Sequence, residues 1–240
     1  MKTTISDKVF QVQLGNAADI LEKAQLLRGK VFLGQEVKDS DRFDAYCDHL
    51  VVTDDDTDQA VGTYRLLLGS VARNTSGFYS ETEFDLSNIR KNCGAELLEM
   101  GRACVDERYR RYSIIGLLWK TILDYIEHKK VGFIFGCASI DEPTSEKVGR
   151  IFGFLKESYY SLPQHRVSPL QDKGFPFLKS GPPLSNRQAI GKLPSLVKGY
   201  LGAGALVCGE PAWDKTFNTA DFFMLLDTAK TNSSYLKKIL

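Results

Sequence analysis

The sequence lacks several features that would place it in other classes of protein. No apolar run approaches the roughly 18 residues that a membrane span needs, and residues 1–16 are polar and alternating, without the apolar core of a secretion signal. The net charge is only +1, so no strong positive field points to nucleic acid. We therefore expect a cytoplasmic protein that has no nucleic-acid partner.

Metal-binding patterns are also scarce. The five cysteines are scattered without a CxxC pair, and the three histidines lack ligand spacing. An odd number of cysteines without a secretion signal favours free thiols in a reducing compartment. Cys137 lies in an apolar run, where a buried thiol is usually unreactive. We expect no metal site and no disulfide.

Hydrophobic periodicity predicts alternating strands and helices. Strand-like runs at 48–53 and 60–68 flank an acidic turn and read as a hairpin, and the continuous apolar run 131–140 is typical of a buried strand. Strands alternating with helices favour an α/β fold with a central sheet of mixed direction. The other predicted strands are 96–105, 205–208 and 219–226, and the predicted helices are 17–33, 83–91, 114–129, 144–157, 187–201 and 229–240.

The composition of the chain changes after residue 160. Residues 161–185 hold five of the eight prolines, which indicates a loop or an extended crossover. We therefore divide the chain into a core, residues 1–160, and a Pro-rich crossover with a C-terminal extension, residues 161–240, packed on the same domain.

The stretch 96–118 reads as a strand, a basic turn and the start of a helix. Glu99 and Arg102 lie three apart in an otherwise apolar strand, where charges are rarely kept without a partner or a role. Arg110 and Arg111 precede the helix, with Ser113 as its predicted N-cap. Free N–H groups at a helix start favour phosphate. The pattern predicts binding of a phosphate-bearing carrier, although a solvated basic turn explains the arginines too.

Further charged residues precede this stretch. Arg65 lies inside an apolar strand, and Arg28 lies four residues before Phe32 on one predicted helical face. Each residue alone could form a structural ion pair, whereas buried charges gathered in one set favour a functional site. Asp44 and Asp48 complete the set.

Eight segments carry a resemblance to a known family: RGKVF, FDAYCDHLVV, VGTYRLL, GFYSETEFDLSNI, LLEMGRACV, LLW, FGCASI and LVKGYLGAGALVCGEPAWDKTFNTADFFMLL. They resemble the ornithine–acyl-ACP N-acyltransferases of the hemolysin-like branch of the GNAT (Gcn5-related N-acetyltransferase) superfamily. The charged positions also resemble those of acyl-homoserine-lactone synthases, but the tryptophan usual there has no counterpart near residues 34–37.

The resemblance implies a GNAT-like acyltransferase fold, with a mixed central sheet, helices on both faces and a C-terminal extension. The strands 97–104 and 133–139 would splay apart and hold the pantetheine arm between them. The resemblance implies Glu99 as general base and Arg102 as a second catalytic residue, and main-chain contacts of Met100 and Arg102 to the pantetheine arm. The substrate-binding residues that it implies are Arg28, Phe32, Asp44, Asp48 and Arg65. The basic turn adds Arg110, Arg111 and Ser113 as pantetheine- or ACP-binding residues. His49 is a further catalytic candidate because its reference pKa of about 6.5 suits a general base, but a structural histidine is the better explanation.

The implied reaction moves a 3-hydroxy fatty acyl chain from acyl carrier protein (ACP) to the α-amine of ornithine, the first step of ornithine lipid biosynthesis. The phosphopantetheine arm of acyl-ACP would be the donor, without a further cofactor. Ser113 and Ile115 stand where CoA-dependent members carry small glycines, which disfavours a CoA acetyltransferase. Glycine or tyrosine as acceptor, a lactone synthase and a non-enzymatic hemolysin remain alternatives. A lipid product would bring the protein into peripheral contact with the inner face of the membrane.

Overall fold

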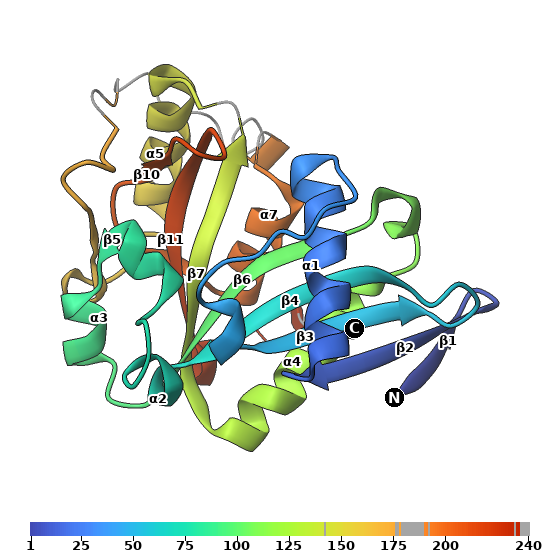
Figure 1. Ribbon diagram of the computed structural model, residues 1–240. Helices are drawn as coiled ribbons and strands as arrows, with labels where there is room; N and C mark the ends of the chain where they lie inside the picture. The colour runs from blue at the N-terminus through green and yellow to red at the C-terminus, as the bar shows by residue number, and fades with distance from the viewer. Residues whose placement is uncertain (142, 176–177, 179–189, 192, 233, 236–240) are drawn as a thin grey trace. The chain divides into compact units, whose positions relative to one another are not determined.

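The computed structural model describes residues 1–141, 143–175, 178, 190–191, 193–232 and 234–235 (Figure 1). These residues form two compact units, the first made of Met1–Phe78 with Leu98–Val131 and the second of Tyr79–Leu97 with Gly132–Tyr235. The predicted division into a core and a C-terminal extension groups the chain differently and stays a prediction.

The first unit contains antiparallel strands in the order β1-β2-β3-β4-β6. The predicted hairpin is confirmed as β3 and β4, which pair from Asp48 opposite Leu66 to Asp54 opposite Gln59. The elements are β1 Lys2–Ile5, β2 Lys8–Gly15, α1 Ala18–Leu33, η1 Asp44–Tyr46, β3 Asp48–Asp54, β4 Gln59–Leu68, α2 Gly69–Ala72, β6 Glu96–Val105, η3 Glu107–Tyr109 and α4 Ile114–Lys129.

The two long helices of this unit cover opposite faces of its strands. Val51 of β3 packs with Ala24 of α1. The next residue, Val52, lies opposite Gly62 of β4, and a Cβ on Gly62 would come within 2.5 Å of the Ile114 side chain of α4. Because successive residues of a strand point to opposite faces, β3 and β4 have one α1 face and one α4 face.

The N-terminal hairpin of β1 and β2 was not predicted. Its strands pair from Lys2 opposite Gln11 to Ile5 opposite Lys8, around a turn in which Ser6 and Asp7 have positive φ angles of 48° and 67°. Two consecutive residues in this region are typical of a tight hairpin turn. The sequence analysis noted only the polar alternation of residues 1–16, and the turn contains no glycine that would have marked a hairpin.

The second unit contains the strand order β7-β11-β10, with β9 also paired to β11, and a separate β5–β8 pair. The predicted helix 83–91 is wrong at its start, because 84–85 form β5 and the helix begins at Ser87. The closing helix predicted at 229–240 falls largely outside the described residues. The elements are η2 Tyr79–Thr82, β5 Phe84–Asp85, α3 Ser87–Asn92, β7 Val131–Asp141, α5 Ser145–Ser158, η4 Pro163–His165, β8 Ser168–Pro169, α7 Ser195–Ala203, β9 Leu206–Val207, β10 Ala212–Asp214, β11 Thr219–Asp227 and η5 Thr228–Lys230.

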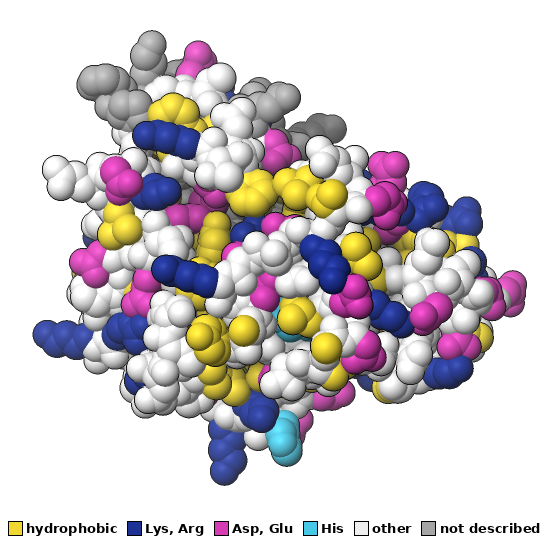
Figure 2. Space-filling view, in the orientation of Figure 1, with side chains coloured by type: hydrophobic (Ala, Val, Ile, Leu, Met, Phe, Trp, Pro, Cys, Tyr) yellow, Lys and Arg dark blue, Asp and Glu magenta, His cyan; other side chains and the backbone are white. Residues whose placement is uncertain are grey.

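On the face shown in Figure 2, lysine and arginine side chains are interspersed with aspartate and glutamate, and the net charge of the chain is +1. Among the described residues, no helix is long and apolar enough to cross a membrane.

Candidate active site

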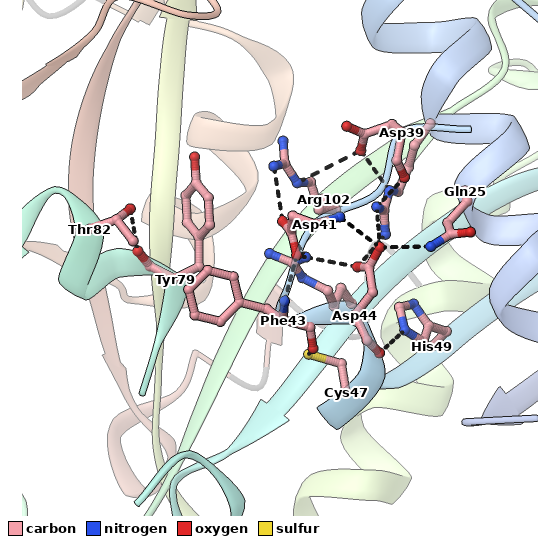
Figure 3. A network of polar contacts seen from close by, with 12 residues as sticks. Gln25, Asp39, Asp41, Phe43, Asp44, Cys47, His49, Tyr79, Thr82 and Arg102 are labelled. Atoms are coloured by element: carbon pink, nitrogen blue, oxygen red, sulfur yellow. Dashed lines mark hydrogen bonds and ion pairs between the residues drawn. The ribbon is translucent and has the colours of Figure 1, made fainter. Parts of the chain in front are cut away.

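A cluster of charged side chains lies on the α1 face of the first unit (Figure 3). Its centre is Arg28 of α1, which is fully buried. The Arg28 guanidinium donates to the Asp39 carboxylate at 2.8 Å and to both oxygens of Asp44 at 2.9 and 2.8 Å, and it also reaches the Asp39 carbonyl oxygen. We call Arg28, Arg65, Arg102, Asp39, Asp41 and Asp44 the Arg–Asp cluster.

The acidic side of this cluster comes from a segment that folds back along α1. The helix ends at Gly34 with a left-handed φ of 66°, the usual glycine stop. The backbone N–H of Asp39 then donates to the carbonyl of Gln25 at 3.1 Å. A Cβ on Gly29 would lie 1.6 Å from the Val37 carbonyl oxygen, so only glycine permits this approach. Gly29 thereby places the acidic segment over Arg28.

Asp44 is the most heavily bonded acid of the cluster. Its carboxylate accepts hydrogen bonds from Arg28, from Arg65 at 2.8 Å and from the Gln25 amide at 2.9 Å. Burial would raise the pKa of Asp44, but the hydrogen bonds and charge of Arg28 outweigh it and hold the pKa well below its usual range. Asp44 is therefore ionised at all physiological pH values.

Two further arginines complete the cluster. Arg65 of β4 donates to both oxygens of Asp41 at 2.7 Å, and Arg102 of β6 donates to Asp41 at 3.1 Å. Three arginines thus face three aspartates, and the cluster is formally neutral. The sequence analysis missed Asp39 and Asp41, although the spacing of acids at 39, 41 and 44 was visible.

A β-bulge in β6 brings the two charges of that strand to one face. Residues three apart in a regular strand point to opposite faces. Here Gly101 lies opposite Arg65 and Cys104 opposite Thr63, so β6 contains one extra residue. Arg102 takes the left-handed region with a φ of 51°, as bulge residues often do. The bulge turns Arg102 toward the face that carries Glu99.

Glu99 lies on the same face as Arg65. It is opposite Leu67 of β4, which is two residues from Arg65 and therefore shares its face. Glu99 is only 5% exposed, and its charge acts on the thiol of Cys47, whose pKa is raised to about 12, chiefly by burial. Glu99 therefore borders the Arg–Asp cluster, and its role as a base stays a prediction.

His49 is also buried beside the cluster. Its Nε2 lies 3.0 Å from the Asp44 carbonyl oxygen. Burial lowers the pKa of His49 despite this contact, so the neutral form prevails near pH 7. Its Nδ1 has no hydrogen-bond partner among the described residues. A catalytic role of His49 stays a prediction.

The structure does not bring Asp48 into the cluster. Asp48 begins β3 one residue before His49 and so points to the α4 face, where its carboxylate accepts a hydrogen bond of 2.8 Å from Tyr125 of α4. Asp44 and Asp48 therefore cannot grip the same small group from their present positions.

The remaining predicted residues lie outside the Arg–Asp cluster. Phe32 is 36% exposed at the end of α1, and Met100 points to the face opposite Glu99. Arg110, Arg111 and Ser113 are exposed before α4. Ser113 precedes the helix as predicted, but it has a φ of 39° and makes no side-chain capping bond, so the predicted capping role is wrong.

Comparison with known proteins adds independent evidence. A family profile described as an acetyltransferase (GNAT) domain matches residues 29–120. The chain is similar to the L-ornithine N(alpha)-acyltransferase of Brucella abortus (strain 2308), with 32% identity over 95% of this chain and 87% of that protein. The protein of the same description from Rhizobium meliloti (strain 1021) is 31% identical over 95% of this chain and 83% of its own length.

The fold is similar to that of a solved structure with little sequence identity. FeeM, an N-acyl amino acid synthase from uncultured soil microbes, is 10% identical and matches with a TM-score of 0.55 over 93% of each chain. At this identity the comparison supports a shared fold alone.

Proposed function

Because this chain belongs to the family of L-ornithine N(alpha)-acyltransferases and carries a GNAT acetyltransferase domain, we propose that it transfers a fatty acyl chain from acyl carrier protein to the α-amine of ornithine. The chain is an acyltransferase with the GNAT-like α/β fold that the sequence predicts. The observation that carries the proposed site is the bulge in β6, which sets Glu99 and Arg102 on one face beside the Arg–Asp cluster.

Glu99 is the proposed general base. The α-ammonium group of ornithine must lose a proton before its nitrogen attacks the thioester carbonyl carbon, and Glu99 accepts that proton directly or through water. Such help is worth roughly 10²–10⁴ in rate. The nitrogen–carbon bond then forms, the carbon–sulfur bond breaks, and the pantetheine sulfur leaves and takes up a proton. The products are an N-acyl ornithine and free ACP.

The developing oxyanion needs hydrogen-bond donors. We assign this role to main-chain N–H groups of Met100 to Arg102, because the bulge interrupts regular pairing with β4 there. Removal of one such donor typically lowers kcat by about 10²–10³. The bulge would thus serve both the oxyanion and the orientation of Arg102.

Arg102 is the arginine best suited to the carboxylate of the amino acid. Its side chain is 14% exposed, compared with 1% for Arg28 and 5% for Arg65. Arg28 and Arg65 are committed to buried aspartates, so we propose that they position the acidic segment and do not bind substrate themselves. For Arg28 and Arg65 we thus propose a positioning role in place of the substrate-binding role that the sequence predicted.

The exposed arginines before α4 are the proposed contact for the donor. Arg110 and Arg111 are exposed next to the N-terminus of a 16-residue helix, where free N–H groups favour a phosphate. Their charge also complements an acidic carrier surface. We propose that the phosphopantetheine arm of acyl-ACP is the donor and that no further cofactor takes part. Because the acylated product is a lipid, we also propose that the protein makes peripheral contact with a membrane.

Lipid analysis tests the acceptor and the donor together. Cells that express the chain alone should accumulate a species with the mass of 3-hydroxyacyl-ornithine, and purified protein should form it from 3-hydroxyacyl-ACP and ornithine. The Glu99→Gln variant is the matched control for background acylation. If the product is an N-acyl glycine or an N-acyl tyrosine, the acceptor is that amino acid instead of ornithine, and the proposed acyl transfer is otherwise unchanged. No new lipid from soluble, folded protein would contradict the proposal.

A further inference from the structure

Three buried carboxylates gather in the second unit. Glu83, Asp214 and Asp221 each place a carboxylate oxygen within 4.8 Å of the other two. Their exposed fractions are 2%, 7% and 4%. The proposed acyl transfer uses none of these residues, and we call them the carboxylate cluster.

Strand register explains how two of the three acids meet. Asp221 of β11 lies opposite Ala212 of β10, and Asp214 lies opposite Thr219. Because 212 and 214 share a face, as do 219 and 221, the two carboxylates project from the same side of the hairpin. The Thr219 hydroxyl donates to Asp221 at 2.9 Å, and the backbone N–H of Thr216 donates to Asp214 at 2.8 Å.

Glu83 differs from its two neighbours. It precedes β5, and neither of its side-chain oxygens has a hydrogen-bond partner among the described residues, although both are buried. A buried carboxylate left without a donor is strongly unfavourable. The Glu83 carboxylate is therefore stabilised only if a positively charged group binds to it or if it takes up a proton.

The carboxylate cluster has no ion-pair partner among the described lysines and arginines. In the described part of the chain, no lysine or arginine forms an ion pair with Glu83, Asp214 or Asp221. In the Arg–Asp cluster, by contrast, three arginines balance three aspartates. The carboxylate cluster therefore holds up to three negative charges that no lysine or arginine of the described residues balances.

We propose that Glu83, Asp214 and Asp221 form a binding site for one compact cation, either a primary ammonium group or a divalent metal ion. Three oxygens around an ammonium at hydrogen-bonding distance stand about 4.6 Å apart in a tetrahedral arrangement. Oxygens bound to calcium at about 2.4 Å stand at most about 4.8 Å apart. The observed limit of 4.8 Å accommodates both.

Both kinds of cation carry the positive charge that would balance these acids. A primary amine is protonated at neutral pH, and a divalent metal ion keeps its charge at any pH. The site is proposed from the carboxylate cluster alone and does not depend on the proposed function.

Cation binding to the purified full-length chain tests the site. Titration calorimetry and thermal melting of EDTA-treated protein are measured with CaCl₂, MgCl₂, methylammonium chloride and tetramethylammonium chloride, which has the charge of methylammonium without its N–H donors. The matched variants are Glu83→Gln and Asp221→Asn, with Glu157→Gln on exposed α5 as the control substitution. Two cluster variants guard against a folding failure in one of them.

The possible results separate the two sources. Saturable binding of calcium or magnesium that weakens at least tenfold in Glu83→Gln, and not in Glu157→Gln, supports the metal arm. Saturable binding of methylammonium, but not of tetramethylammonium, that weakens at least tenfold in Glu83→Gln and not in Glu157→Gln supports the ammonium arm. If neither effect is seen, a shared proton neutralises the cluster and the cation site is overturned. Continued acylation of ornithine in that case would leave the proposed function intact.

Discussion

Replacement of Asp44 by asparagine is expected to destabilise the first unit by about 3 kcal/mol. The asparagine amide group can accept on one side only, so at least two of the donors that now meet Asp44, from Arg28, Arg65 and Gln25, lose their acceptor. Loss of one partner from a buried ion pair typically costs about 3–5 kcal/mol. The lower end applies because Arg28 retains Asp39 and Arg65 retains Asp41.

Differential scanning calorimetry measures this loss. For a chain of this size about 1 kcal/mol corresponds to a shift of about 2–4 °C in Tm, so the variant should melt about 6–12 °C below the wild type at pH 7. The folded-state pKa of Asp44 is depressed, so its stabilisation is present above the unfolded pKa near 3.8 and is lost as the pH falls below it. The gap in Tm should therefore narrow in acid.

Asp48→Asn is the matched control, because Asp48 accepts a single side-chain hydrogen bond on the opposite face, which the remaining oxygen of asparagine can still accept in weaker form. It should cost about 1 kcal/mol. If Asp44→Asn melts within about 2 °C of the wild type and loses ornithine binding, Asp44 is a substrate ligand and the assignment to positioning is wrong.

Three further predictions follow from other parts of the chain. Glu99→Gln should lower kcat for acyl transfer by about 10²–10⁴ without loss of fold, as judged by circular dichroism, and full turnover would remove the base assignment. Arg110→Glu with Arg111→Glu should raise KM for acyl-ACP at low salt while Lys120→Glu on α4 does not; an unchanged KM would place the carrier elsewhere. Burial, and then the negative charges of Asp221 and Asp214, raise the pKa of Glu83 to about 8, and the nearby Cys137 and Tyr79 side chains oppose this shift only in part. Without a bound cation, stability should then fall as the pH rises from about 4.5 to 8, because folding takes up a proton in that window, and chemical denaturation of Glu83→Gln should show a flatter profile.

Strong periodicity made the central elements predictable. Helices α1 and α4, the β3–β4 hairpin, β6 and β7 lie within one or two residues of their predicted bounds. Their apolar faces are long enough for the spacing of hydrophobic residues to distinguish a helix from a strand. The start of α3 was mispredicted because β5 is fixed by pairing with Ser168 and Pro169, more than eighty residues away, which no local pattern records.

The site was predictable in its residues but not in its geometry. The strand charges Arg65, Glu99 and Arg102 stood out because charge is rare in apolar strands. Their convergence depends on a one-residue bulge, and regular alternation would have separated Glu99 from Arg102. Asp39 was missed because its burial depends on the close approach that Gly29 permits, a tertiary contact that composition does not reveal.

The Arg–Asp cluster has a consequence for how the enzyme's kinetics can be read. Burial opposes the charged form of its members, yet the ion pairs prevail, lowering the pKa of Asp41 and Asp44 and raising that of Arg28 and Arg65. These four groups keep their charge from about pH 5 to 9. They are electrically silent across the assay range, so the limbs of a pH–rate profile report the catalytic base and the substrate amine, undistorted by titration of these four residues.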